Sequence, residues 1–533
     1  MSGLAIILAV AAIAAGIARW LRIPSIPLFL IGGLAIQQII QWSGRTVPED
    51  LLFDTLSLGL AVIVFAAGVE LSPHRVRHRL KPVLIIGLGQ FCCIGLIMFA
   101  CGNLLGFDWL TAAYLGAALA ASSTLVVVRH LKTTQRMFEP FGRLVTGVLL
   151  LQDAIIVAFL VIFVRMSDGA GAVATGVLAT MALAAGALIC YRWIVPWVTL
   201  SLHLDDEETL LFAFLLLFAF VSVSSLLGLP FIVGAFFAGF TLSAFPTNGL
   251  VRGILASFSD FFLAVFFVVL GLIVAIPSPE ILVKAIVLGT ILIGFTVALV
   301  AALGERCGLN ARNAIRTGLL LTQTSEFSLI LVLQGVAAGL LAAEVFSLVV
   351  FLTVMTMTLT PFIATDRVTN LVLRLHPRPR TPLPANPPRD HVLLVGLDYF
   401  GDHLLDSVRE AGFELVVLDD DAVRVRELCE RKIDCRQIDT MDTETLDRAG
   451  IREAKTILCA PTHPRETYGL LRHAKQYART RPFVRVFDED EAREVEALGG
   501  RPIIMTARTV ESLLDWIQTV HPKDAGTVGA RSE

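Results

Sequence analysis

The sequence has little charge, no paired cysteine motif and no excess of basic residues. Only 17% of its 533 residues are charged and the formal net charge is −3, so a nucleic-acid partner is not indicated. None of the eight cysteines forms a CxxC pair, which leaves zinc and dithiol sites without support. A Thr-Val-Gly-Tyr-Gly filter is also missing, and this counts against a potassium channel.

Apolar residues are abundant, at 55% of the sequence, and form long runs from Gly3 to about Thr365. Thirteen runs have a length suited to crossing a membrane as helices. They are 3–18, 26–41, 52–70, 83–105, 110–128, 140–164, 171–200, 209–227, 230–245, 254–275, 280–303, 313–338 and 343–365. We therefore expect a polytopic α-helical membrane domain over residues 1–370.

Basic residues gather in the loops after spans 1, 3, 5 and 11. They are Arg19, Arg22, Arg75, Arg77, Arg79, Lys81, Arg129, Lys132, Arg136, Arg306 and Arg312. The positive-inside rule then places the odd-numbered loops and the C-terminus in the cytoplasm and the N-terminus outside. Thirteen spans also require opposite ends, and the expected location is the bacterial inner membrane.

A second domain follows a proline-rich linker. Residues 376–388 hold six prolines, so we expect a semi-rigid linker over 371–389. Beyond it, apolar strands at 391–395, 414–418, 435–438, 456–459 and 483–487 alternate with helical segments. This alternation predicts a doubly wound, Rossmann-like parallel sheet over 390–515, with a tail at 516–533.

Asp153, with Gln152 beside it, lies within the apolar run of span 6. A charged Asp at the centre of a membrane helix costs about 2.5–3.5 kcal/mol on an insertion scale, so it should face a polar cavity. Asp153 either hydrogen-bonds between helices or binds a cation and a proton in turn. One carboxylate beside a neutral amide offers one removable proton, which favours electroneutral exchange.

Spans 5 and 12 carry further polar residues in apolar surroundings: Ser122, Ser123 and Thr124, and then Gln323 and Glu326. They either hydrogen-bond backbone and neighbouring helices or mark helices broken in mid-membrane, where carbonyls and hydroxyls complete an ion site. Spans 5 and 12 correspond if repeats of six spans flank span 7. Glu326 binds the ion or pairs with a cationic residue.

Lys284, near the start of span 11, either extends to the membrane interface or pairs with a core carboxylate. In the second domain, Gly396 and Gly401 flank Asp398 directly after a strand, and Asp419 ends the next strand. This is the context of a phosphate-binding loop with an acid near the ribose, although Asp398 replaces the middle glycine. The alternative is a domain that only dimerises and couples.

Together these motifs resemble the cation:proton antiporter 2 family, in particular its Kef-type glutathione-gated potassium efflux systems. Gln152-Asp153 is similar to the family's Gln-Asp pair and Ser122-Ser123-Thr124 to its crossover helix. The stretches 320–327 and 230–239 are similar to two more of its segments. Residues 390–510 resemble the regulator-of-potassium-conductance domain, also called the potassium-transport nucleotide-binding domain.

The resemblance implies a homodimer in which a core domain moves like an elevator and exchanges potassium or sodium for protons. It also implies a nucleotide, AMP or NAD-like, on the cytosolic domain; Asp398 bears less on a mononucleotide than on NAD. Membrane lipid is the expected surrounding partner. The rivals are a potassium channel gated by the same domain and a nicotinamide-dependent membrane oxidoreductase, but nothing in the soluble part resembles a substrate domain, so no enzyme is expected.

Overall fold

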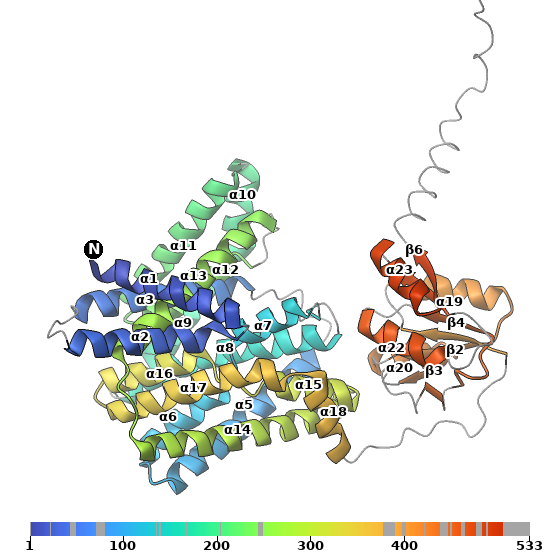
Figure 1. Ribbon diagram of the computed structural model, residues 1–533. Coiled ribbons are helices and arrows are strands. Elements are labelled where there is room, and N and C mark those ends of the chain that lie inside the picture. Colours follow the sequence, from blue (N-terminus) through green and yellow to red (C-terminus); the bar gives the residue numbers. More distant parts are fainter. Residues whose placement is uncertain are drawn as a thin grey trace, which may run out of the picture. The chain divides into compact units, whose positions relative to one another are not determined.

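The computed structural model describes most of the chain, which divides into two compact units. Described residues are 2–21, 23–42, 49–70, 80–134, 136–137, 140–166, 169–202, 204–243, 249–376, 390–396, 401–419, 422–437, 446–447, 450–459, 464–475, 482–486 and 489–504. The first unit, Met1–Cys307 with Asn313–His376, is helical (Figure 1). The second unit, Gly308–Arg312 with Pro377–Glu533, contains a parallel sheet.

Helices of the first unit follow the predicted apolar runs. They are α1 (Ser2–Leu21), α2 (Ser25–Trp42), α3 (Glu49–Glu70), α5 (Leu80–Leu104), α6 (Trp109–Ala120), α7 (Thr124–Thr133), α8 (Pro140–Met166), α9 (Ala170–Ile189), the π-helix η2 (Cys190–Ile194), α10 (Val195–Leu202), α11 (Asp206–Leu226), α12 (Phe231–Thr241), α13 (Gly249–Ile273), α14 (Pro279–Arg306), α15 (Ala311–Leu320), α16 (Glu326–Ala337), α17 (Ala343–Ile363) and α18 (Asp366–Leu375). Each of the thirteen predicted spans coincides with one helix or with consecutive helices.

By length and composition, eight segments of the described chain suit a membrane span. They are Gly3–Leu21, Leu80–Leu104, Trp109–Thr133, Phe141–Met166, Ala170–Thr199, Glu207–Leu226, Pro279–Arg306 and Ala343–Ile363. Four shorter apolar helices, Ser25–Ile40, Phe231–Thr241, Ser257–Ile273 and Glu326–Ala337, lie at other predicted spans, and α3 lies at the remaining one. The first unit is therefore a polytopic helical membrane domain.

Glycine allows a very close approach between α2 and α13 and between α3 and α12. Where α2 crosses α13, a Cβ atom on Gly33 would lie 2.2 Å from a carbonyl oxygen of α13, next to Gly271. Where α3 crosses α12, a Cβ atom on Gly239 would lie 2.0 Å from a carbonyl oxygen of α3, next to Gly68. Small residues allow such backbone contact between membrane helices.

These two crossings are related by the predicted repeat. A shift of seven spans converts span 2 into span 9 and span 3 into span 10, and so relates the α2–α13 crossing to the α12–α3 crossing. The same shift relates spans 5 and 12, and both are broken: α6 and α7 are separated by residues 121–123, and α15 and α16 by 321–325. The helices thus carry the internal symmetry expected of inverted repeats.

The second unit is a doubly wound parallel sheet with strand order β3-β2-β1-β4-β5-β6. Its strands are β1 (Val392–Val395), β2 (Leu415–Asp419), β3 (Asp434–Gln437), β4 (Thr456–Cys459), β5 (Phe483–Val486) and β6 (Arg501–Ile504). Its helices include α19 (Gly401–Glu410), α20 (Ala422–Glu430), α22 (Pro464–Ala474) and α23 (Glu489–Ala497). Alternate residues of β1 belong to different apolar clusters, as in a strand buried on both faces.

Sequence patterns located five of the six strands and missed β6. This strand holds Pro502 and pairs on one side only, with β5. Proline within an apolar run argues against a strand except at a sheet edge, and β6 is such an edge. Residues 377–389 of the predicted linker and the tail at 516–533 lie outside the described residues.

Candidate functional site

The two breaks of the helical unit contact each other. The Ser325 amide donates a hydrogen bond to the Ala121 carbonyl at 3.0 Å, and the Gln323 side-chain amide donates to the Ser123 carbonyl at 3.2 Å. All four residues are buried. A polar backbone released by a broken membrane helix must find partners inside the protein, and here each break supplies partners for the other.

Helix α8 contributes Asp153 and Gln152 to the same place. The Thr124 hydroxyl donates to Asp153 Oδ2 at 2.6 Å, and the Ser122 amide donates to Gln152 Oε1 at 3.1 Å. Asp153 is 1% exposed. The predicted residues of spans 5, 6 and 12 are thus brought together.

The ends of the broken helices give this region two kinds of partial charge. Thr124 and Glu326 are the first residues of α7 and α16, whose N-terminal dipoles favour nearby carboxylate charge. The C-terminal ends of α6 and α15, which lie at the same breaks, present carbonyl groups, and these attract a cation. A charged carboxylate with a cation beside it therefore suits the crossing of the two breaks.

Gln90 of α5 also belongs to this group, and it was missed in the sequence. Its amide nitrogen donates to Ser122 Oγ at 3.1 Å and to the Leu321 carbonyl at 3.4 Å, so it contacts both breaks. The Ser122 hydroxyl donates to the same carbonyl at 2.9 Å. Gln90 is 1% exposed. A single glutamine in the apolar run Leu-Ile-Ile-Gly-Leu-Gly-Gln was the only signal for it.

Several buried oxygens around the crossing have no hydrogen-bond partner among the described residues. They are Gln90 Oε1, Ser123 Oγ, Asp153 Oδ1, Gln323 Oε1 and both carboxylate oxygens of Glu326. A buried polar group without a partner costs about 1–3 kcal/mol, so native proteins rarely retain several in one place without a ligand. Amide, hydroxyl and carboxylate oxygens are ligands suited to a hard monovalent cation or a proton.

Glu326 has no cationic partner among the residues described in the structure. It is 1% exposed, and the Ser123 hydroxyl and the Asp153 carboxylate lie within electrostatic reach of it. The alternative in which Glu326 pairs with a basic residue therefore finds no support. Two buried carboxylates close together cannot both hold a negative charge without a cation.

Among the described residues Lys284 pairs with Glu280 and not with a core carboxylate, so the alternative that makes it a supporting residue of the polar core is wrong. Its ammonium pairs with Glu280 one turn earlier on α14 at 2.7 Å and lies 4.9 Å from the centre of the Phe107 ring. Glu280 is 77% exposed. The long aliphatic stem of Lys284 thus carries its ammonium group toward the N-terminal end of α14. This agrees with the alternative in which Lys284 extends to the membrane interface.

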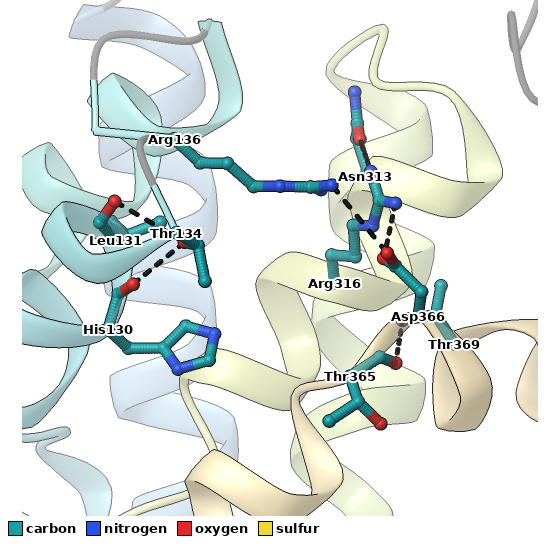
Figure 2. Close-up of polar contacts among 9 residues, drawn as sticks. All are labelled: His130, Leu131, Thr134, Arg136, Asn313, Arg316, Thr365, Asp366 and Thr369. Atoms are coloured by element: carbon teal, nitrogen blue, oxygen red, sulfur yellow. Dashed lines mark hydrogen bonds and ion pairs between the residues drawn. The ribbon is translucent and has the colours of Figure 1, made fainter. Parts of the chain in front are cut away.

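A second polar cluster joins the far ends of the broken helices to α18 (Figure 2). Asp366, the first residue of α18, accepts from Arg316 of α15 at 2.7 Å and faces Arg136, which follows α7, at 3.8 Å. Arg316 also donates to Asn313 at 3.4 Å. Both arginine side chains are at most 10% exposed, so Asp366 neutralises buried charge. We call the C-terminal end of α7 and the part of α15 around Arg316 the bases of the two broken helices.

Further ion pairs at this end join α7 to other helices. Lys132 lies 3.6 Å from Glu70 at the end of α3, and Arg129 pairs with Asp260 of α13. Glu70 ends span 3, Lys132 and Arg136 belong to loop 5, Arg316 lies near the start of span 12, and Asp366 belongs to loop 13. The helix ends next to these odd-numbered loops therefore lie close together, as alternating spans require.

In the second unit, the predicted nucleotide residues lie at the carboxyl ends of β1 and β2. Gly396 follows β1 with a φ of +79°, and its amide donates to the Leu418 carbonyl at 2.8 Å. Asp419 ends β2 and is 6% exposed, while Gly401 begins α19. Asp398 lies outside the described residues. Strand order changes direction between β1 and β4, where doubly wound sheets bind ligands.

Family profiles match both units. The family described as sodium/hydrogen exchanger, transmembrane, matches residues 6–365, and the TrkA-N domain matches residues 392–506. The first match covers well over half of the chain and includes both broken helices.

Known proteins similar to this chain include transporters from several organisms. The ammonium/H(+) antiporter subunit AmhT of Alkalihalophilus pseudofirmus is 25% identical over 61% of this chain and 83% of that protein. The glutathione-regulated potassium-efflux system protein KefC of Shigella sonnei is 25% identical over 88% of this chain and 76% of that protein. The structure of the sodium proton antiporter MjNhaP1 from Methanocaldococcus jannaschii covers 70% of this chain and 98% of its own, with a TM-score of 0.52 and 17% identity, and so supports the fold.

Proposed function

Since the chain belongs to the family of transmembrane sodium/hydrogen exchangers, we propose that Asp153 binds a monovalent cation and a proton alternately and so exchanges them across the membrane. The observation that carries this proposal is the group of buried, unpartnered oxygens around the crossing of the two broken helices. A proton on Asp153 satisfies the carboxylate when no cation is present. A bound cation replaces that proton and draws on the other free oxygens.

The neighbours of Asp153 have distinct roles in this proposal. Thr124 donates to Oδ2 and leaves Oδ1 open toward a ligand. Ser123, Gln323 and Gln90 each contribute a buried oxygen without a partner. Gln152 and Ser122 fix the break of α6–α7 through the bond between them.

Glu326 determines the stoichiometry. Because no cationic side chain of the described residues neutralises it, Glu326 keeps its proton while Asp153 exchanges its own for the cation. One monovalent cation then replaces one proton, and transport is electroneutral. If Glu326 also released its proton, each cycle would move net charge.

Potassium is the favoured cation, because KefC is named as a potassium-efflux system protein and a similar protein from Alkalimonas amylolytica carries the name K(+) efflux antiporter KefB. Sodium and ammonium are the alternatives, the latter because of the name of AmhT. A potassium channel gated by a similar cytosolic domain would conduct potassium without a proton gradient. The proteoliposome assay described below separates such a channel from an exchanger.

The TrkA-N domain regulates this exchange. It lies beyond α18, whose Asp366 holds the bases of both broken helices. In our proposal the domain faces the cytoplasm and binds AMP or an NAD-like nucleotide at Gly396, Gly401 and Asp419. Two copies of the chain pair as a homodimer, and the cytosolic domains restrain the moving core until a ligand releases it.

The test is proton movement in proteoliposomes with an internal pH dye and no imposed voltage. Potassium, sodium, lithium and ammonium salts are added in turn to wild type, Asp153→Asn and Glu326→Gln. We expect one cation or a small set to dissipate the pH gradient in wild type, no response above protein-free liposomes in Asp153→Asn, and retained exchange in Glu326→Gln.

The controls address electrogenicity and the channel. A potential set with valinomycin should leave the initial rate unchanged, whereas a voltage-dependent rate would show that each cycle moves net charge. Cation flux without proton movement would favour the channel. Equal exchange by wild type and Asp153→Asn would overturn the assignment of Asp153.

A further inference from the structure

Helix α18 has a buried face and an exposed face of distinct composition. Thr369 and Leu373 are buried. Arg367, Leu371, Arg374 and Leu375 are all exposed, with Leu371 at 58% and Leu375 at 83%. Their spacing of four, three and one residues places them on one side of a helix. We call these four residues the α18 outer face.

The charge of the outer face is not neutralised by any residue that the structure describes. Neither Arg367 nor Arg374 forms an ion pair or a hydrogen bond within the described parts of the chain, whereas Asp366 on the inner side is held by Arg316. From residue 367 to residue 380 the sequence contains four arginines and no acid. An anionic partner therefore fits this stretch better than a neutral one.

The location of α18 restricts what can contact this face. The spanning segment of α17 ends at Ile363, and α18 begins three residues later, so it starts where the chain leaves the membrane. Exposed leucines beside arginines are typical of a helix that lies in the interface, with leucine toward acyl chains and arginine toward headgroups. Basic clusters directly after a spanning helix attract anionic lipids.

From these observations we infer that the α18 outer face binds anionic phospholipid in the leaflet next to the end of α17. Leu371 and Leu375 insert at the level of the acyl chains, and Arg367 and Arg374 contact the phosphate groups. The inference rests on membrane insertion of α17 and not on transport through Asp153. It adds a lipid-dependent attachment to the helix whose first residue holds α7 and α15.

The test compares thermal unfolding of the purified full-length chain in neutral detergent with added dioleoylphosphatidylglycerol or dioleoylphosphatidylcholine. We expect the anionic lipid to raise the Tm of wild type by a few degrees more than the zwitterionic lipid does. Arg367→Gln/Arg374→Gln should lose this difference. The control Arg409→Gln/Arg426→Gln removes the same charge from exposed positions of the second unit and should keep it.

Two further arms separate lipid binding from its rivals. Leu371→Gln/Leu375→Gln should respond less to either lipid, and soluble glycerol 1-phosphate should not reproduce the shift. Retention of the lipid difference in Arg367→Gln/Arg374→Gln, or an equal shift with glycerol 1-phosphate, would overturn the inference. The inference would also be overturned if Arg367→Gln/Arg374→Gln had a lower Tm in detergent alone and an unchanged response to lipid. That result would show that another part of the protein covers the α18 outer face. Asp153→Asn should respond as wild type, whatever its transport activity.

Discussion

Asp153 is a carboxylate with one oxygen bound to the protein and one left for a ligand. Thr124 occupies Oδ2, and Oδ1 accepts nothing from the described residues. The nearby Glu326 has no cationic partner among the described residues. In our proposal a proton or a cation satisfies this site, and each excludes the other, which would be the physical basis of exchange.

Substitution of Gln90 should weaken cation affinity more than it slows turnover. Gln90→Leu removes a buried oxygen and two hydrogen bonds, but the Ser122 hydroxyl still donates to the Leu321 carbonyl. A loss of about 1–1.5 kcal/mol raises the cation KM roughly tenfold with little change in maximal rate. Asn103→Leu changes an exposed amide on the same helix and should behave as wild type. An unchanged KM in Gln90→Leu would remove Gln90 from the site.

The cysteines of the second unit should differ in reactivity. Burial, with the neighbouring Asp419, raises the pKa of Cys435 to about 12, and burial raises the pKa of Cys459 to about 12. At pH 8 only about one in 10⁴ of either thiol is a thiolate, the reactive form. Cys429 is exposed. Iodoacetamide followed by peptide mass spectrometry should label Cys429 from pH 7 to 9 and spare the other two. Labelling of Cys459 as fast as Cys429 would contradict its burial.

Among the elements, the broken helices and the glycine crossings lie on different helices. The breaks α6–α7 and α15–α16 place polar backbone inside the membrane domain, while the crossings α2–α13 and α3–α12 bring helices into backbone contact. A shift of seven spans relates each feature to its counterpart. A change at a crossing should therefore disturb folding before it disturbs the ion site.

Gly239→Val tests this at the α3–α12 crossing. A Cβ atom there would lie 2.0 Å from a backbone carbonyl oxygen, so the helices must separate. Overpacking of this kind costs about 1–3 kcal/mol or more, and we expect a lower yield of folded protein on size-exclusion chromatography and a lower Tm. Gly186→Val is the matched control, because no atom lies within 4 Å of a Cβ at Gly186. Equal stability of the two variants would argue against the close crossing.

Apolar runs, loop charge and strand–helix alternation were sufficient to predict the spans, the two units and most of the sheet. The polar residues of spans 5, 6 and 12 were also identified as candidates for an ion site, because carboxylates and hydroxyls within apolar runs are costly, but the sequence left their contacts with one another open. Gln90 was missed because a lone glutamine has no pattern, and β6 was missed because of Pro502. Lys284 was left with two alternatives, because the sequence does not show whether it pairs with Glu280, one turn earlier, or with a core carboxylate.

In the whole molecule, Asp366 is the residue through which regulation would reach the site. It contacts Arg316 of α15 and Arg136 after α7, and it begins the helix that leads toward the TrkA-N domain. The bases of both broken helices are therefore held by one carboxylate. Regulation by the domain then requires no contact with the transported ion.

Asp366→Asn should uncouple the domain from the exchanger. The substitution removes the carboxylate that faces two largely buried arginines, which loosens α18 from α15 and α7. Because Asp366 is 36% exposed, the cost is smaller than the ~3–5 kcal/mol of a fully buried pair. If the TrkA-N domain restrains the core, removal of residues 390–533 raises the exchange rate of wild type, and full-length Asp366→Asn already shows the higher rate. Glu280→Gln, which breaks an exposed pair, should leave regulation unchanged. A response of Asp366→Asn to the truncation equal to that of wild type would exclude this route.

The most direct measurement of the central claim is the release of protons when a cation is added to the purified protein in weakly buffered detergent. With wild type we predict about one proton released per cation bound, at a pH where Asp153 is protonated without the cation. Asp153→Asn should release none, and Glu326→Gln should release as much as wild type. Cation binding by wild type without proton release, or release that persists in Asp153→Asn, would contradict competition at Asp153.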